Sequence, residues 1–325
     1  MNDDYRMVIR RTGGPEVIER EPIDPPRPNP GEAVVRQQAV GLNFIDTYHR
    51  SGLYALPLPT GLGSEAAGIV EAVGEGVSEV AVGDRVAYLG GPVGAYATLR
   101  AVPAAQLVRV PDGIGLDQAA AVMLKGLTAD MLIGPCGEAR PGMVVLVHAA
   151  AGGVGSILVQ WLKAMGAIVI AHAGSAEKAE KALALGADHA LDCPFEELGD
   201  AVRALTGGEG VALVLDGVGK ASFDASLAAL ARRGLMVSYG NASGAVPPVS
   251  PLALSPKSLF LTRPRVFDYV ATRAELEASA GRLFAMLEQG KVRVEIGQRF
   301  ALAEAAEAHR ALEARRTTGS TLLLP

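Results

Sequence analysis

The sequence predicts an α/β protein of two domains, one rich in β-strands and one built on a six-stranded parallel sheet. The chain has 325 residues, more than the about 250–300 at which a single core stops growing. Hydrophobic residues make up 49% and charged residues 20%, which is typical of a folded globular protein. From about residue 126, short apolar runs alternate with helix-length, alanine-rich segments. That alternation is the pattern of a parallel sheet covered on both faces.

The first part of the chain reads as β-rich. Short β-branched runs at 32–43, 66–74 and 84–90 are separated by Gly, Pro and Asp, as strands and their turns are. The segment 21–31 is so rich in proline that we expect neither a helix nor a strand there.

The middle part contains six predicted strands in strict alternation with helices. The strands are expected at 143–148, 167–172, 189–192, 211–216, 234–239 and 258–263. The intervening helices are expected at 156–165, 176–186, 196–207 and 220–234. Such an order of elements predicts a parallel sheet.

Beyond Pro264 the pattern changes to a long helix near 272–290, a strand at 291–300, a helix at 302–316 and a last strand at 320–324. We interpret this tail as returning to complete the first domain. The sequence therefore predicts a β-rich domain from residues 1–125 and 265–325, with an α/β domain at 126–264 inserted between them.

The stretch "HAAAGGVG" at 148–155 is the densest run of small residues in the chain and joins a predicted strand to a predicted helix. It matches the dinucleotide fingerprint with Ala150 in place of the first glycine. We expect Gly152 to allow close approach of a pyrophosphate and Gly155 to allow tight packing of the helix on the strand. The helix N-terminus would supply N–H groups and partial positive charge for the phosphates.

The end of the next strand indicates which nucleotide binds. In NAD enzymes an acidic residue about 20 residues after the first glycine binds the ribose hydroxyl, but residues 172–175 contain no carboxylate. Ser175 and Lys178 instead offer a hydroxyl and an ammonium, which suit a 2′-phosphate. The sequence therefore favours NADP(H) over NAD(H).

Composition excludes several other classes of protein. The net charge of −5 gives no electrostatic basis for binding nucleic acid or anionic lipid. No apolar run is long enough for a membrane span, and the N-terminus lacks the pattern of a secretory signal. Two cysteines, Cys136 and Cys193, cannot form a disulfide framework. We therefore expect a cytoplasmic protein that binds neither nucleic acid nor membranes.

Several longer motifs stand out along the chain. They are "GLNFIDTYHRSGLY" (41–54), "GLGSEAAGIVEAVG" (61–74), "KGLTA" (125–129), "HAAAGGVG" (148–155), "RRGLMVSYGNASGAV" (232–246) and "LTRP" (261–264). Together they resemble the quinone oxidoreductases of the zeta-crystallin family, within the medium-chain dehydrogenase/reductase superfamily. The resemblance runs from about residue 13 to the C-terminus. It implies a GroES-like catalytic domain joined to a Rossmann domain.

Many members of that superfamily bind zinc, but this sequence departs from their ligand pattern. Where they carry "GHE", this chain has Gly63, Ser64 and Glu65, and no cysteine lies in the stretch 41–54 that corresponds to the first ligand. Zinc requires thiolate and imidazole ligands at fixed positions. We therefore expect no metal site.

The resemblance also implies roles for individual residues. Asn43, Asp46, Tyr48 and Tyr54 are expected at the catalytic centre. The cofactor-binding residues implied are Asn43, Phe44, Ile45, Asp46, Thr47, Thr128, Gly153, Val154, Gly155, Gly174, Ser175, Lys178, Gly240, Asn241, Ser243, Leu261, Thr262, Arg263 and Arg315.

Within this set, Ser175, Lys178 and Arg315 are expected at the 2′-phosphate, whereas the groups near 43, 240 and 262 are expected at the nicotinamide half. Cys193 stands where some members of the family have a tyrosine at the adenine edge.

Other polar residues are interpreted as structural. We expect His49 to lie at the surface or behind the site, Glu65 to form an ion pair or hydrogen bond, and Asp216 to organise a turn. Cys193 is expected to be a buried, unreactive thiol, and Trp161 to pack in the core.

The resulting hypothesis is NADPH-dependent reduction of quinones without metal or flavin, by a protein that forms a homodimer. One alternative is NADPH-dependent reduction of the C=C bond of α,β-unsaturated carbonyls, whether enals, enones or enoyl thioesters. A non-enzymatic alternative is an NADPH-binding structural protein or an RNA-binding protein.

Overall fold

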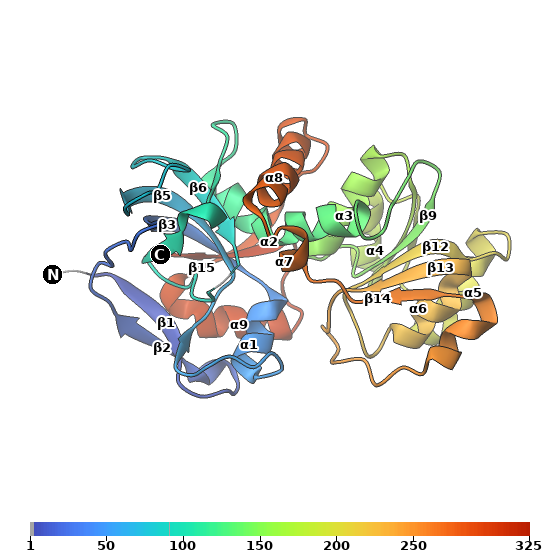
Figure 1. The fold of residues 1–325 in the computed structure, drawn as a ribbon. Helices are drawn as coiled ribbons and strands as arrows, with labels where there is room; N and C mark the ends of the chain where they lie inside the picture. The colour runs from blue at the N-terminus through green and yellow to red at the C-terminus, as the bar shows by residue number, and fades with distance from the viewer. Residues whose placement is uncertain (1–2, 91) are drawn as a thin grey trace. The chain divides into compact units, whose positions relative to one another are not determined.

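The structure is a computed structural model that describes residues 3–90 and 92–325, drawn in Figure 1. Residues 1–2 and 91 of the predicted first domain lie outside the described part. The chain divides into two compact units. The first unit comprises Met1–Leu127, Val270–Glu288 and Val294–Pro325, and the second comprises Thr128–Tyr269 and Gln289–Arg293.

The first unit is organised around strand β3 (Glu32–Leu42), the longest strand of a seven-stranded sheet in the described part of the chain. The sheet has the order β15-β16-β3-β5-β6-β8, and β7 also pairs with β3. Its other strands are β5 (Glu65–Val73), β6 (Arg85–Leu89), β7 (Leu99–Pro103), β8 (Val108–Arg109), β15 (Ile296–Ala301) and β16 (Ser320–Leu324). Because β16 pairs antiparallel with β3, the end of the chain completes the sheet that its beginning starts.

A smaller sheet and several helices pack with this sheet in the first unit. The small sheet has the order β2-β1-β4, formed by β1 (Tyr5–Ile9), β2 (Ile18–Pro22) and β4 (Thr60–Gly61). Strand β2 therefore includes the first two residues of the segment expected to be irregular. The helical segments are η1 (Pro15–Val17), α1 (Phe44–Ser51), η2 (Ala104–Gln106), α8 (Arg273–Glu288), η4 (Leu302–Glu304) and α9 (Ala305–Glu313).

The second unit contains the predicted parallel sheet. In the described part of the chain its six strands have the order β11-β10-β9-β12-β13-β14, and every neighbouring pair is parallel. The strands are β9 (Val144–His148), β10 (Ile168–His172), β11 (His189–Leu191), β12 (Val211–Asp216), β13 (Leu230–Ser238) and β14 (Phe260–Thr262). This is the strand order of the Rossmann fold, and the prediction of the fold class is confirmed.

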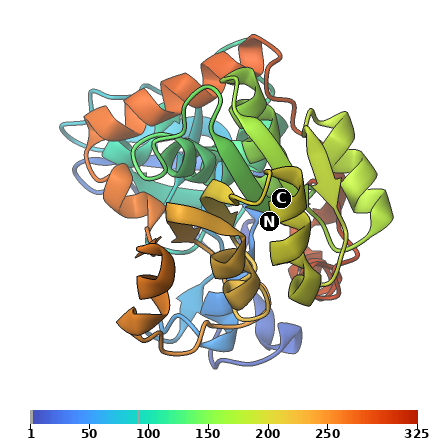
Figure 2. The same ribbon diagram turned by 90° about the vertical axis from the view of Figure 1, so that its right-hand side faces the viewer.

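Helices cover this sheet on both sides, as the turned view in Figure 2 shows. Right-handed crossovers run from β9 toward opposite edges of the sheet, so the two sets of helices lie on opposite faces. Helix α3 packs on β9 and β10, whereas α6 packs on β12 and β13. The helical segments are α3 (Gly153–Ala164), α4 (Ala176–Ala184), α5 (Phe195–Leu205), α6 (Phe223–Ala229), η3 (Pro251–Lys257) and α7 (Val266–Tyr269).

The structure corrects several predicted elements. Helix α2 (Leu116–Ile133) was not predicted and runs across residue 126, where the expected domain boundary lies. Helix α3 begins inside the glycine stretch rather than after it. The strand expected at 291–300 begins only at Ile296, and the helix expected at 220–234 is limited to the seven residues of α6 because the chain then enters β13.

Candidate functional site

The turn after β9 has the features of a pyrophosphate site. Ala149 has a φ of 48°, in a region that residues with a Cβ rarely adopt. The turn leads to Gly152, the N-cap of α3, which has no side chain to satisfy the first N–H groups of the helix. Among the described residues no acceptor is found for the N–H groups of Gly153 and Val154, because the first intrahelical bond is donated by the N–H of Ser156. These donors and the helix dipole make the turn suited to an anion.

Glycine is required at Gly155 for a steric reason. A Cβ at this position would lie 2.2 Å from the carbonyl oxygen of Ala149 and 2.8 Å from the Cα of Ala150. Both neighbours are backbone atoms, so they cannot move aside as a flexible side chain would. At Gly152 the nearest atom would be the same oxygen at 3.1 Å. The structure thus agrees with the packing role expected for Gly155, and the cofactor role of both residues stays a prediction.

The residues that are predicted to bind the 2′-phosphate follow β10. Ser175 is the N-cap of α4, and its hydroxyl oxygen accepts a bond from the backbone N–H of Lys178 over 3.4 Å. The Lys178 side chain is half-buried and its ammonium has no partner among the described residues. Gly174 is exposed, and a Cβ there would meet no atom within 4 Å. Two donors, a hydroxyl and an ammonium, therefore lie in one turn with space beside them.

A fully buried carboxylate organises the turn after β12. One oxygen of Asp216 accepts the backbone N–H groups of Val218 and Gly219, over 2.8 and 3.1 Å. This confirms the turn-organising role expected for Asp216.

The loop after β13 lies against that turn. The hydroxyl of Ser243 donates to the carbonyl of Val218 over 2.8 Å, and the Ala221 N–H donates to the Ser243 oxygen over 2.9 Å. A Cβ on Gly240 would lie 2.3 Å from the carbonyl oxygen of Gly217. The structure therefore brings two of the predicted nicotinamide-side residues, Gly240 and Ser243, into one packed pair of loops.

The side chain of Arg263 binds the backbone at the end of β13 in the second unit. One of its guanidinium nitrogens donates to the carbonyls of Ser238 and Gly240, over 3.0 and 2.9 Å. This guanidinium nitrogen of Arg263, a residue predicted to bind the cofactor, thus holds the backbone of the loop that carries Asn241.

In the first unit the predicted catalytic residues lie at the start of α1. Asn43 is the N-cap, and its side-chain amide donates to Glu65 over 2.7 Å. Glu65 is fully buried and also accepts the backbone N–H of Leu124 over 2.6 Å and the ammonium of Lys125 over 2.9 Å. The ion pair expected for Glu65 is therefore present, and it fixes the orientation of the Asn43 amide.

Asp46 lies beside this group with no exposed surface. Its oxygens accept the Asn43 N–H over 2.9 Å, the Tyr96 hydroxyl over 3.0 Å and the Ser64 hydroxyl over 3.1 Å. Burial raises the pKa of Asp46 to about 7, against the effect of these hydrogen bonds. Because each oxygen is occupied by a donor of the protein, the structure supports a positioning role for Asp46 at the N-terminus of α1.

A buried chain of polar groups continues from Asp46 to α9. The Tyr96 hydroxyl also contacts Nε2 of His309 at 3.0 Å, and Nδ1 of His309 lies 3.0 Å from a guanidinium nitrogen of Arg50. Arg50 donates in turn to Glu313 over 3.1 Å. Because a guanidinium only donates, Nδ1 of His309 accepts, and Nε2 carries the hydrogen of the neutral ring. Burial, together with the charge of Arg50, lowers the pKa of His309 to about 3.

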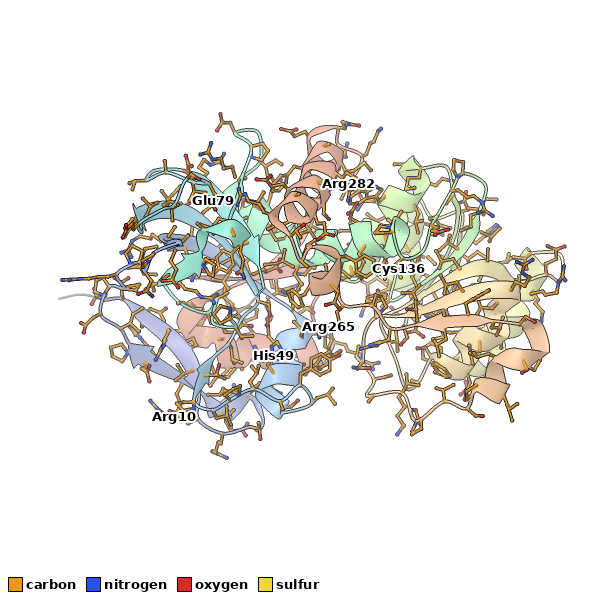
Figure 3. All side chains as sticks on the ribbon, viewed as in Figure 1. Arg10, His49, Glu79, Cys136, Arg265 and Arg282 are labelled. Carbon is orange, nitrogen blue, oxygen red and sulfur yellow. The ribbon has the colours of Figure 1, made fainter. Side chains whose placement is uncertain are left out.

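Aromatic rings gather on α1 and the segment after it. The rings of Tyr48 and Tyr54 meet edge to face with centroids 5.3 Å apart, and Phe44 lies 6.5 Å from Tyr48. His49, labelled in Figure 3, is buried, and its Nδ1 has no partner among the described residues. Burial lowers the pKa of His49, so the ring is neutral near pH 7. Of the two expected positions for His49, the structure excludes the surface.

The other predicted residues lie on α1, α2 and β14 and in the segment after α9. Ile45 and Thr47 are on α1, Thr128 is half-buried on α2, and Leu261 and Thr262 are on β14. Arg315 follows α9, with a φ of 56° and an exposed side chain. The structure does not test the cofactor role of any of these residues, which stays a prediction.

Sequence reasoning missed residues that the fold brings to the candidate sites. In the first unit these are Tyr96, Lys125 and His309, and in the second they are His148, His172 and Ser226. Lys125 and His148 begin the motifs at 125–129 and 148–155, but neither motif gave them a role, and no local motif marks the other four. The one signal in the sequence was that His148, a polar residue, ends an otherwise apolar strand immediately before the glycine stretch.

Both cysteines are free and half-buried. Burial raises the pKa of the Cys193 thiol, and burial likewise raises that of Cys136, which follows α2 and is labelled in Figure 3. Cys193 is thus less buried than expected. Within residues 3–90 and 92–325, no group of three or more His, Cys, Asp or Glu side chains is placed to hold a metal ion.

The helices of the described residues include none that combines the length and the apolar character needed to cross a membrane.

Comparison with known proteins identifies both parts of the chain. A family described as "Alcohol dehydrogenase GroES-like domain" matches residues 29–112, and one described as "Zinc-binding dehydrogenase" matches residues 153–285. A quinone oxidoreductase of Pseudomonas aeruginosa is 53% identical over 322 residues, which cover 98% of this chain and 99% of the relative. A 2-haloacrylate reductase of a Burkholderia species is 40% identical over 327 residues, which cover 98% of both chains.

A solved structure gives the same result. Escherichia coli quinone oxidoreductase complexed with NADPH superposes with a TM-score of 0.96 at 44% identity, over 99% of this chain and all of that one. A GroES-like domain joined to a Rossmann domain defines the class, the medium-chain dehydrogenases/reductases. Within it, the chain belongs to the quinone oxidoreductase family. The resemblance seen in the sequence is confirmed.

Proposed function

We propose that this protein is an NADPH:quinone oxidoreductase that works without metal or flavin. The observation that carries the proposal is the N-terminus of α3, where the N–H groups of Gly153 and Val154 have no acceptor among the described residues and a Cβ at Gly155 would collide with the backbone of Ala149. Family membership supports it, because relatives at 44–53% identity are named quinone oxidoreductases and one of them is solved with NADPH.

The residues of the second unit fit NADPH. The turn at Gly152–Gly155 receives the pyrophosphate, and Ser175 and Lys178 receive the 2′-phosphate through charge-assisted hydrogen bonds. No carboxylate occupies residues 172–175 to repel that phosphate. When bound, NADPH supplies the hydride for a conjugated acceptor, while the protein supplies orientation and electrostatics.

The residues of the first unit orient the reactants and protonate the reduced acceptor. Glu65 and Lys125 hold the amide of Asn43, and Asp46 holds its backbone N–H. A quinone is a strong acceptor and needs little polarisation, so no Lewis acid is required for its reduction. The hydroxyls of Tyr48 and Tyr54, or solvent, supply the proton to the reduced oxygen.

A second candidate is reduction of a C=C bond conjugated to a carbonyl group. The observation in its favour is the 40% identity to a 2-haloacrylate reductase over nearly the whole chain. Delivery of hydride to an activated alkene uses the same orientation of cofactor and acceptor, so the same residues would serve either reaction.

Steady-state oxidation of NADPH with four acceptors separates the two candidates. The acceptors are a small quinone, a 2-haloacrylate, a short enal and an enoyl thioester. We expect kcat/KM for the quinone to exceed each of the others by at least about tenfold. A larger kcat/KM for any of the alkenes would replace quinone reduction by C=C reduction as the function.

The non-enzymatic alternative makes a different prediction. A structural or RNA-binding protein would bind NADPH tightly, turn over none of the four acceptors and change its NADPH affinity when RNA is added. We infer that the protein binds no nucleic acid, because its net charge is −5 and protein–nucleic acid affinity depends chiefly on positive charge.

The remaining features of the proposal concern assembly, location and domain limits. We infer a homodimer, because β14 is an edge strand that pairs only with β13 among the described residues and exposes 57% of Phe260. We place the protein in the cytoplasm and away from membranes, because its two cysteines are both free, as is usual in a reducing compartment. The domain limits 1–125 with 265–325, and 126–264, complete the proposal.

A further inference from the structure

Four polar side chains of the second unit form a buried chain beneath the turn after β9. Nδ1 of His148 lies 3.3 Å from Nδ1 of His172, and Nε2 of His148 lies 2.9 Å from the hydroxyl oxygen of Ser226. That oxygen is 2.7 Å from a carboxylate oxygen of Asp216. At the other end, Nε2 of His172 is 3.0 Å from the backbone carbonyl of Cys193. His148, Asp216 and Ser226 have no exposed surface.

Counting hydrogens along the chain shows which contacts are satisfied. The carbonyl of Cys193 only accepts, so Nε2 of His172 carries a hydrogen. If His172 is neutral, its Nδ1 accepts, and the hydrogen between the two rings belongs to Nδ1 of His148. If His148 is also neutral, its Nε2 accepts and needs a hydrogen from Ser226.

The count then falls one hydrogen short. The Ser226 hydroxyl has a single hydrogen, but it faces two acceptors, Nε2 of His148 and an ionised Asp216, at 2.9 and 2.7 Å. Ser222 does not make up the difference, since its own hydrogen is directed to the same carboxylate or to the Gly219 carbonyl. A neutral His148 with its hydrogen on Nε2 would satisfy both contacts of Ser226, but it would move the deficit to the 3.3 Å contact between the two rings. Leaving any one of these three contacts without a hydrogen would set two lone pairs against each other in a buried site, which is costly.

We propose that Asp216, Ser226, His148 and His172 share one additional proton, which makes an uncharged hydrogen-bonded chain that positions the cofactor turn after β9. With this proton each of the four contacts has one donor and one acceptor. Starting from Asp216 or from one of the rings, each group then donates a hydrogen bond to the next group toward the Cys193 carbonyl. The proton belongs to the chain as a whole, as in other coupled buried groups.

The surroundings favour the uncharged chain over a lone imidazolium. Burial lowers the pKa of His148, and so does His172, while Asp216 opposes them. The groups that face the rings are Phe195 of α5 at 5.0–5.9 Å between centroids, Asp216, Ser226 and, toward His172, the carboxylate of Asp192. Among the described residues no lysine or arginine contacts this chain, so no side-chain cation balances a net charge there.

The chain connects the elements that carry the proposed NADPH site, and its positioning role rests on that proposed function. His148 directly precedes Ala149, whose backbone has the positive φ. The Ala150 N–H donates to the carbonyl of His172 over 3.2 Å. The other oxygen of Asp216 holds the turn at Val218 and Gly219. One network therefore fixes the ends of β9, β10 and β12.

The proton count is tested by unfolding, without any ligand. In Asp216→Asn the amide nitrogen has two hydrogens for Ser222 and Ser226, so Ser226 donates to a neutral His148 and no additional proton is needed. Between pH 7.5 and 9 the Asp216 carboxylate and both imidazoles of the unfolded chain are unprotonated, so the additional proton is absent there. We expect the ratio of the unfolding constant of the wild type to that of Asp216→Asn to rise about tenfold for each pH unit. A ratio that does not change with pH would overturn the proposal.

Ser226→Ala is a second variant, which removes the hydroxyl group between His148 and Asp216. It leaves His148 and Asp216 without their common partner, so we expect its NADPH Kd to rise at least about tenfold. Equal NADPH affinity of Ser226→Ala and wild type would overturn the positioning role. Failure of the wild type itself to bind NADPH would refute the proposed function but leave the pH test of the proton intact.

Discussion

At the scale of single residues, we propose that Lys178 determines the choice between NADPH and NADH. Its ammonium has no partner among the described residues and lies one turn from the exposed Gly174 and the hydroxyl of Ser175. Lys178→Ala removes a charge-assisted contact to the 2′-phosphate, so we expect the KM for NADPH to rise several-fold and the KM for NADH to stay nearly constant. Steady-state kinetics with both nucleotides measure this.

Lys181→Ala is the matched control, since it removes an ammonium from the same helix at the end distant from Ser175. It is expected to leave the preference for NADPH unchanged. Equal effects of Lys178→Ala on both nucleotides would contradict the assignment of the 2′-phosphate.

A second prediction at this scale concerns the acid stability of the first unit. Burial lowers the pKa of His309 to about 3, below its ordinary value of about 6.5. The unfolded chain thus binds a proton that the folded chain does not, so stability is lost as the pH falls from about 6.5 toward 3. His309→Gln lacks this group, and we expect its deficit in urea midpoint relative to the wild type to be largest near pH 7.5.

The deficit of His309→Gln should shrink as the pH falls through 6 to 4, where the wild type loses the contribution of the neutral ring. A deficit that is constant over this range would show that the imidazole titrates normally in the folded protein.

Groups of site residues differ in how far the sequence predicts that their members lie together. The group at Ser175 and Lys178 could be found because it lies in one turn at a known distance from a fingerprint. The chain of His148, Asp216 and Ser226 could not, because its members come from different strands and a helix and meet only when the sheet forms. Likewise, nothing near Asp46 in the sequence announces Tyr96.

At the scale of elements, the packing of α3 on its turn depends on Gly155. Gly155→Ala would place a methyl group 2.2 Å from the Ala149 carbonyl oxygen, so we expect a lower unfolding temperature and at least about tenfold weaker NADPH binding. Calorimetry and fluorescence titration measure the two effects. Gly281→Ala is the control, because a Cβ there meets no atom within 4 Å and alanine in a helix is more favourable than glycine by about 0.5–1 kcal/mol.

If Gly155→Ala bound NADPH like the wild type, the α3 turn would not be as tightly packed as described.

Elements were predicted best where their hydrophobic pattern is periodic and their ends carry Gly, Pro or Asp. The strands β9, β10 and β12 agree with expectation within one residue. Helix α2 was missed because it is apolar on nearly all sides, with Ala119 through Met123 fully buried, so no amphipathic period marks it. Strand β13 begins early because residues 230–233 continue it through a bulge, which propensity alone does not show.

At the scale of the whole molecule, the exposed edge of β14 leads to a prediction about assembly. Phe260 is 57% exposed on this strand, and an edge strand with an apolar side chain favours pairing with another chain. Phe260→Asp adds charge at the proposed contact, so we expect it to shift a dimer toward the monomer in light scattering. A wild type that is monomeric at micromolar concentration would contradict the homodimer.

The parallel sheet of the second unit was predicted from the alternation of strands and helices, because parallel strands must be joined by a crossover, which is usually a helix. The return of β16 to β3 was inferred from the change of pattern after Pro264. The pairing partner and register of each strand could not be inferred, since they depend on contacts such as Leu323 with Val40 that are remote in sequence.

The most direct test of the central claim is oxidation of NADPH and NADH with a small quinone, with and without a strong chelator. We predict turnover with a clear preference for NADPH and the same kcat/KM after chelation. Loss of activity on chelation would contradict the metal-free reaction. Absence of quinone turnover by a protein that binds NADPH tightly would contradict quinone reduction itself.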